Sequence, residues 1–378
     1  MPRREKTRPD ATPAVTAARA LLEAEIGGPG PALDWEAIAP SAEVERLAAW
    51  LYSLGRTRQV PAERLHPLRP AWLAFRRQHL VAVQELERLL DAFDEAGVPV
   101  IPLKGPVLAE TLYRDPACRP LTDLDALVPP AQASAAIEVL RRLGYRHLGH
   151  ERTLAYEQAH AGAACFVPAA SSAARLPVDL HWSLLSFPGG FVPSGVRDPG
   201  VWERARRVEW LGRPVRQLAD DDLLLYLALH LAVHHPLSGL RWRLELGVCL
   251  ARDGDSVSWS DVAARARAWR VSGALYFALR ATATTFAVAA PLGTMASLRP
   301  RGLRGKLLDR LASTVDARPS LEYLVNVVSL DTAADRLRLA RRGLAPSPSW
   351  VRARYDSPSA VRGWREHYGR ALGALKPR

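Results

Sequence analysis

The sequence predicts an α+β fold, with a small mixed β-sheet set between N-terminal and C-terminal helical regions. Residues 14–97 and 216–342 carry apolar residues at the three- and four-residue spacing of helices. Residues 98–215 instead contain five short β-rich segments, which are too few and too closely spaced for a full doubly wound sheet. Hydrophobic residues make up 48% and charged residues 24% of the 378 residues, and these are ordinary values for a globular protein.

These changes of pattern predict the order of the domains. We expect a disordered lead over 1–13, an N-terminal helical region over 14–97, a core of strands and helices over 98–215, a helical domain over 216–342 and a basic aromatic tail over 343–378. Within the core, the predicted strands are 98–103, 123–128, 144–147, 164–167 and 176–181, and the predicted helices are 105–113 and 131–143. A further helix over 223–235 follows three aspartates, which suit a helix N-terminus.

Net charge and cysteine content indicate which partners, which covalent or metal links and which cell compartment to expect. The formal net charge is +12, and residues 299–378 alone contain 17 basic and 7 acidic residues, so the excess belongs to the C-terminal part and makes nucleic acid a candidate partner of the tail. Three widely spaced cysteines, Cys118, Cys165 and Cys249, predict neither a disulfide framework nor a zinc site and favour a cytoplasmic location. The longest apolar run, 223–233, is about half the length of a transmembrane helix.

Two aspartates in one predicted strand are the strongest candidates for chemistry. Asp123 and Asp125 stand at i and i+2, so their side chains project from the same face of the strand. Asp179 lies in another predicted strand and is the candidate third carboxylate. Three converging carboxylates can hold two divalent cations about 4 Å apart and neutralise phosphate charge. We therefore expect these residues to be catalytic and to bind Mg²⁺, as two ions, with Mn²⁺ as an alternative.

A lysine and a glycine precede that strand at a predicted strand-to-helix turn. Gly105 lets backbone N–H groups approach an anion, the helix N-terminus favours negative charge, and Lys104 adds a point charge suited to phosphate. Arg119 stands just before the carboxylate strand, where a guanidinium can meet a phosphate or simply pair with an acidic neighbour. The P-loop sequence Gly-x-x-x-x-Gly-Lys-Ser/Thr is absent from the chain.

These motifs resemble those of a known family. The segments that carry the resemblance are Leu103-Lys-Gly-Pro-Val-Leu-Ala109, Leu112-Tyr113, Arg119 and Thr122-Asp-Leu-Asp-Ala-Leu-Val128. They look like the signature of the bacterial uncharacterised nucleotidyltransferase family, within the polymerase-β-like nucleotidyltransferase superfamily. The specific part covers about 98–182, and weaker agreement continues to Pro346-Ser-Pro-Ser-Trp350.

The resemblance implies a nucleotidyltransferase core in which each motif has a role. It makes Asp123 and Asp125 the metal carboxylates, Asp179 the third carboxylate, and Lys104-Gly105 the equivalent of the superfamily's Gly-Ser phosphate-binding turn. One departure is Pro106, which is permitted in a first helical turn but removes one N–H donor from it.

Three histidines and one charged stretch are further candidates for the site, each with a structural or a functional role. His230 and His234 share a helix face at i and i+4, and they either pack at the core or rim of the site or contact the nucleotide; no third zinc ligand accompanies them. His181, which follows Asp179, is a candidate general base. The stretch with Arg241, Arg243 and Glu245 predicts a salt-bridged surface helix, with a contact to nucleotide as the alternative.

The function these observations favour is Mg²⁺-dependent transfer of NMP from an NTP, ATP first, to a hydroxyl or phosphate of a small-molecule or peptide acceptor. The resemblance suggests natural-product or polysaccharide biosynthesis as the setting. Two alternatives remain open: an RNA- or tRNA-directed, toxin-like enzyme, and a non-catalytic nucleotide- or peptide-binding partner of a biosynthetic complex. The tail bears on whether the acceptor is RNA. Its aromatic rings either stack on bases while its arginines contact phosphates, or cover the helical domain while the arginines stay in solvent.

Overall fold

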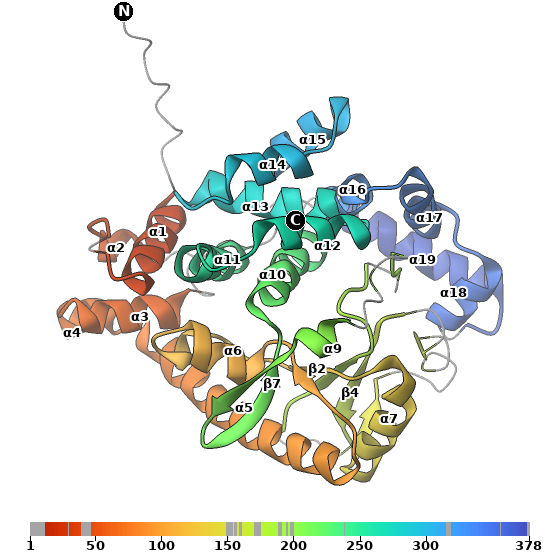
Figure 1. Cartoon of the computed structure of the whole chain (residues 1–378), viewed down its shortest axis with the longest axis horizontal. Helices are drawn as coiled ribbons and strands as arrows, with labels where there is room; N and C mark the ends of the chain where they lie inside the picture. Colours follow the sequence, from red (N-terminus) through yellow and green to blue (C-terminus); the bar gives the residue numbers. More distant parts are fainter. Residues whose placement is uncertain are drawn as a thin grey trace, which may run out of the picture.

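The computed structural model confirms the α+β fold, with helical N- and C-terminal regions around a small mixed sheet (Figure 1). It describes residues 12–28, 30–38, 47–148, 154, 157–158, 161–169, 175–187, 191–193, 196, 200–237, 239–314, 319–355 and 357–375. Most of the predicted lead, residues 1–11, lies outside the described residues, and the first helix begins at Pro13.

Five strands form the main sheet, and all five lie where the sequence predicts them. Their order is β1-β2-β5-β4-β3, and only β2 and β5 run parallel. The strands are β1 (Ile101–Pro102), β2 (Leu124–Leu127), β3 (Tyr145–His147), β4 (Ala163–Pro168) and β5 (Val178–His181). The parallel pair at the centre of the sheet is the one that carries the predicted carboxylates.

A separate β-hairpin was not predicted. It consists of β6 (Arg206–Trp210) and β7 (Arg213–Gln217), joined by Leu211 and Gly212. Both turn residues have positive φ, +50° and +79°, as the commonest two-residue hairpin turns require. Leucine is unusual there, so the turn lacks the Asn-Gly signal that identifies such hairpins in a sequence.

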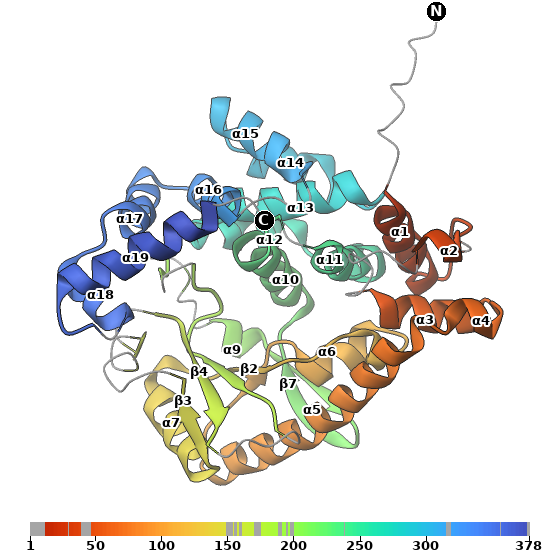
Figure 2. The same cartoon turned by 180° about the vertical axis from the view of Figure 1, so that it is seen from behind.

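Helices cover one face of the main sheet, called the back face here. The helices are α5 (Arg69–Glu95) and α7 (Ala133–Arg142), and Figure 2 shows both beside β3 and β4. Phe93 of α5, Leu140 of α7 and Phe166 of β4 are almost completely buried in one apolar cluster with the sheet. Because Val178 and Leu180 of β5 join the same cluster, the alternating residues of β5 must face the other side.

The helical region beyond the sheet shares one apolar core with the N-terminal helices. Leu21 and Leu22 of α1 lie in the same cluster as Leu244 and Leu246 of α11, and Gly247 allows close approach to Leu22. The N-terminal helices are α1 (Pro13–Glu25), α2 (Trp35–Ile38), α3 (Ala48–Thr57) and α4 (Ala62–Leu65); α6 (Gly105–Leu112) and α9 (Gly200–Arg204) lie within the core segment. The later helices are α10 (Asp220–His234), α11 (Leu240–Asp253), α12 (Trp259–Ala268), α13 (Ser272–Thr285), α14 (Leu292–Leu298), α15 (Gly302–Ala312), α16 (Pro319–Ser329) and α17 (Ala333–Leu344). Three-residue 3-10 turns, Pro116–Cys118 and Pro130–Gln132, precede β2 and α7.

The basic aromatic tail forms two helices, α18 (Pro348–Arg354) and α19 (Ala360–Leu375). Trp350 is buried, and the Trp364 indole donates a hydrogen bond to the carbonyl of Pro346. The Tyr355 hydroxyl contacts His367 Nδ1 at 2.8 Å. These rings are engaged within the chain, whereas arginines of the tail lie at the surface: Arg352, Arg354, Arg362 and Arg365.

The sequence predicts neither a transmembrane helix nor a disulfide framework, and the described residues bear on both. No helix among them is long and apolar enough to cross a membrane. Cys118, Cys165 and Cys249 are all free thiols.

Candidate active site

The register of the two central strands brings the predicted carboxylates together. Asp125 of β2 lies directly opposite Asp179 of β5 in the parallel pair. Asp123 comes two residues before Asp125, and His181 two residues after Asp179, so all four side chains project from the face opposite the back face. The carboxylate arrangement expected from the sequence is therefore present on one side of the sheet.

These side chains open into a cavity of about 270 Å³, called the carboxylate cavity here. Helix α10 supplies the facing wall. The lining residues are Lys104, Asp123, Asp125, Asp179, His181, Leu184, Leu185, Tyr226, His230, His234 and His235. Of the residues singled out in the sequence, the cavity thus gathers the three aspartates, Lys104 and both histidines of α10, whereas Gly105 and Arg119 are not in its lining.

Lys104 reaches the cavity from the turn between β1 and α6. Gly105 has φ +67°, a left-handed conformation that disfavours residues with a Cβ, and this sharp turn directs the lysine away from the helix. The Lys104 ammonium lies 3.2 Å from Asp125 Oδ2 and 2.9 Å from His230 Nε2. It also lies 5.9 Å from the centroid of the Tyr226 ring. The lysine is therefore fixed between a carboxylate and an imidazole.

His230 acts as an acceptor for that lysine. It is buried on α10, and burial, together with the positive charge of Lys104, holds the pKa of its imidazole well below the usual value. A neutral imidazole can accept a hydrogen bond from the ammonium through Nε2, which places the ring proton on Nδ1. His234 lies one turn further on and is exposed.

Asp123 and Asp125 have pKa values shifted in opposite directions. Burial alone would raise the pKa of Asp125, but Lys104 and His181 outweigh it and hold this pKa below its usual range. The pKa of Asp123 is raised by burial and by the negative charge of Asp125. Asp125 is therefore more firmly ionised than Asp123, and the crowded negative charge favours a cation in the cavity.

The donor atoms fit a divalent cation. Oxygens of Asp125 and Asp179 and a ring nitrogen of His181 all lie within 4.8 Å of one another. Asp123 lines the same cavity but is not in this closest group. Sequence reasoning gave His181 only as a candidate base; the signal for a ligand role was its position two residues after Asp179 in a strand, on the same face.

Arg119 has a different partner from the phosphate that the sequence suggested. Its Nε donates to Glu245 Oε2 at 2.8 Å, and the Tyr113 hydroxyl donates to the same oxygen at 2.5 Å. Arg243 and Glu245 of α11 are both 2% exposed, so the expectation of a surface helix is wrong, although the salt bridge is present. The burial of α11 against α1 and α13 explains the difference. A phosphate contact by Arg119 stays a prediction.

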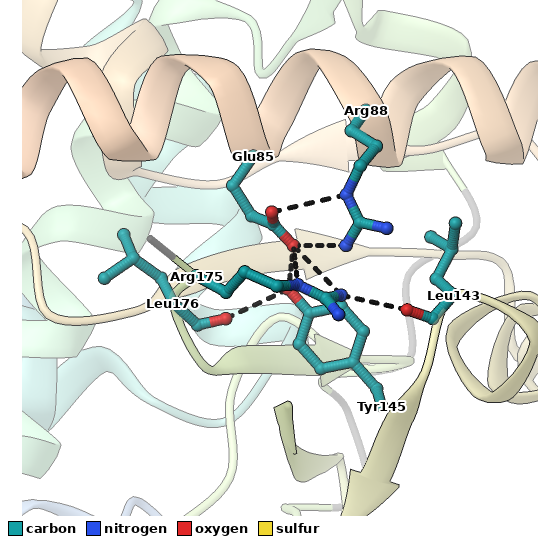
Figure 3. Close-up of polar contacts among 6 residues, drawn as sticks. All are labelled: Glu85, Arg88, Leu143, Tyr145, Arg175 and Leu176. Carbon is teal, nitrogen blue, oxygen red and sulfur yellow. Dashed lines mark hydrogen bonds and ion pairs between the residues drawn. The ribbon is translucent and has the colours of Figure 1, made fainter. Parts of the chain in front are cut away.

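A cluster on the back face fixes the start of β5, as Figure 3 shows. This Glu85 cluster consists of Glu85, Arg88, Tyr145 and Arg175. Glu85 is bonded to Arg88 at 2.6 Å and to the Tyr145 hydroxyl, and Arg175 lies 3.4 Å from the same carboxylate. The Tyr145 hydroxyl also lies 3.0 Å from the carbonyl oxygen of Leu176, immediately before β5, so its one proton is shared between this carbonyl and Glu85. The cluster thereby ties the strand that carries Asp179 to helix α5.

Comparison with known families places the chain in a class of enzymes, the nucleotidyltransferases, which are transferases. The chain belongs to the family described as uncharacterised nucleotidyltransferase, which matches residues 31–287. The match includes the N-terminal helices from α2 onward and extends to the end of α13, further in both directions than the specific motifs. It does not include 346–350, where weaker agreement was expected. A comparison with curated proteins gives no match.

Proposed function

We propose that the chain transfers a nucleoside monophosphate from an NTP, with ATP as the first candidate, to a hydroxyl or phosphate of a small-molecule or peptide acceptor. The observation that carries this proposal is the carboxylate cavity, in which Asp125 and Asp179 lie opposite each other beside the Lys104 ammonium. Family membership supports nucleotidyl transfer in general. Each part of the cavity then has a role in that chemistry.

Asp123, Asp125 and Asp179 are proposed to hold the divalent cations, Mg²⁺ or Mn²⁺. A bound cation there would neutralise phosphate charge and activate the attacking oxygen. Lys104 would bind a phosphate oxygen as a point charge, and His230 keeps its ammonium at a fixed place in the cavity. Leu184 and Leu185 line the same cavity, and their apolar side chains would keep water from one side of a bound nucleotide. Most of the rate gain would come from positioning and charge neutralisation, with no side-chain nucleophile.

The test combines ATP binding with pyrophosphate release. Purified protein is titrated with ATP and Mg²⁺ by calorimetry, and pyrophosphate is assayed with each of the four NTPs and a panel of sugars, hydroxy acids and peptides as acceptors. Asp125→Asn and Asp179→Asn should each lower pyrophosphate release about a hundredfold or more, because loss of roughly 3 kcal/mol of cation stabilisation has that effect.

Asp255→Asn is the matched control, since Asp255 is an exposed aspartate in the loop after α11. It should keep the wild-type rate. Wild-type release by both active-site variants would overturn the proposal, and so would wild-type protein that neither binds ATP with Mg²⁺ nor releases pyrophosphate.

A further inference from the structure

His181 is a largely buried imidazole whose one polar contact to a described residue is the ion-pair distance to Asp125. Neither ring nitrogen is solvent-accessible, and neither makes a hydrogen bond to another described residue. The side chain as a whole is 15% exposed. Buried polar atoms in native proteins are almost always hydrogen-bonded, so an imidazole that has only an ion-pair contact at the edge of a cavity points to a ligand that the working protein holds there.

The surroundings of His181 Nε2 identify the chemistry of that ligand. Asp125 Oδ1 lies 3.3 Å from Nε2, close enough for an ion pair when the imidazole is protonated but without the geometry of a good hydrogen bond. Two adjacent ligands of an octahedral ion, each about 2.1 Å from it, are separated by roughly 3 Å, which is close to this spacing. Asp179 completes the group, whose donor atoms all lie within 4.8 Å of one another. The nitrogen therefore lies where a third ligand of a shared cation belongs.

We propose that His181 Nε2 is a ligand of a divalent cation together with Asp125 and Asp179, and that this site binds Mn²⁺ in preference to Mg²⁺. The inference rests on the proposed function only in that a cation occupies this face of the sheet. Mg²⁺ selects oxygen ligands and water; Mn²⁺ also favours oxygen, but as a first-row transition metal it accepts an imidazole nitrogen more readily than Mg²⁺ does. Asp123, which lines the cavity outside the closest group, is left for a second, all-oxygen position.

The pairing of β5 with β2 places the three proposed ligands close together. Asp179 lies opposite Asp125 and His181 lies opposite Leu127, so the imidazole reaches Asp125 along a diagonal. Trp182 follows in the chain, and its indole donates to the carbonyl of Ala161 at 2.8 Å, which restrains the end of the strand. The position of the imidazole is thus set by backbone pairing on one side and by a buried tryptophan on the other.

The decisive measurement is electron spin-echo envelope modulation on the nucleotide-free protein loaded with Mn²⁺. Bound Mn²⁺ should show modulation from a directly coordinated ¹⁴N in the wild type and none in His181→Gln. His234→Gln is the matched control, because His234 lines the same cavity but is not in the ligand group, and it should retain the ¹⁴N signal.

Metal titration gives an independent readout. His181→Gln should weaken Mn²⁺ binding roughly tenfold or more while changing Mg²⁺ binding less than about threefold, since only the transition metal uses the nitrogen. His181→Asp should keep cation binding through an oxygen and lose the ¹⁴N signal. Absence of ¹⁴N coupling in the wild type, or its persistence in His181→Gln, would overturn the proposal. If His181→Gln fails to fold, His181→Asp supplies the same test by loss of the ¹⁴N signal.

Failure of this inference and failure of the proposed function are separable. The spectroscopy and titrations contain no nucleotide, so a protein that transfers no nucleotide can still show nitrogen ligation. Conversely, an active enzyme whose Mn²⁺ shows only oxygen ligands would retain the proposed function and assign His181 to another task, such as the general base that the sequence suggested.

Discussion

At the scale of single residues, Gly105 decides where Lys104 points. The backbone of Gly105 has φ +67° at the first position of α6, and a Cβ added there would meet Leu124 Cδ2 at 3.6 Å, an ordinary contact. Space is therefore available for a methyl group, and the constraint is the backbone conformation itself. The lysine at the turn can extend toward Asp125 only while this conformation is maintained.

Gly105→Ala should consequently lower the free energy of unfolding by about 1–2 kcal/mol, the cost of a left-handed conformation for a residue with a Cβ. Urea denaturation followed by circular dichroism measures it. Gly293→Ala is the control: Gly293 lies in α14 with no atom within 4 Å of an added Cβ, and the same change there should be neutral or stabilising. Equal effects of the two substitutions would contradict the role given to the turn.

At the scale of elements, β5 is positioned from behind by the Glu85 cluster. The bonds from Arg88 and Tyr145 outweigh burial and hold the pKa of Glu85 below its usual value of 4.5. A group whose folded pKa is depressed stabilises the fold above its unfolded pKa, and the stabilisation is lost as the pH falls through the folded pKa.

The stability difference between wild type and Glu85→Gln should therefore be largest above about pH 5 and shrink steadily as the pH falls below 4.5. Chemical denaturation at a series of pH values measures this difference. Glu87→Gln, an exposed neighbour on α5, should show little difference at any pH. A gap between wild type and Glu85→Gln that stays constant down to pH 3 would show that Glu85 does not titrate with a depressed pKa.

The elements also show what the sequence could and could not predict. The five strands and the convergence of Asp123, Asp125 and Asp179 on one face were predictable, because β-rich segments and side-chain alternation are local properties. The β6–β7 hairpin was missed, since Leu211-Gly212 is an atypical turn. The partnership of Arg119 with Glu245 joins residues 126 positions apart, and no local pattern reveals such a pairing.

At the scale of the whole molecule, the aromatic rings of the tail contact one another and the tail's own backbone, while four of its arginines lie at the surface. Trp350 is 7% exposed and Val351 is fully buried, whereas the neighbouring Arg352 is exposed. The positive charge of the tail is thus carried by arginines at the surface, such as Arg352. The division into five segments over 1–378 remains a prediction. Helices α1–α3 share their apolar core with α10–α13.

Trp350→Ala should lower the free energy of unfolding by about 3–5 kcal/mol, as loss of a buried indole generally does. Arg352→Ala, two residues away, should change it by no more than about 0.5 kcal/mol. Equilibrium unfolding in urea measures both. A small effect of Trp350→Ala would mean that the tail detaches without cost, which the burial of its tryptophan does not allow.

The shared core also imposes an order of events during synthesis. Helix α1 buries Leu22 against α11, whose residues leave the ribosome about 220 positions later. At roughly 5–20 residues per second, the first helix waits on the order of 10–45 s for its partner. During that interval the part of its alanine- and leucine-rich face that α11 covers in the finished fold is exposed to solvent, whereas α2 and α3 can already pack on α1.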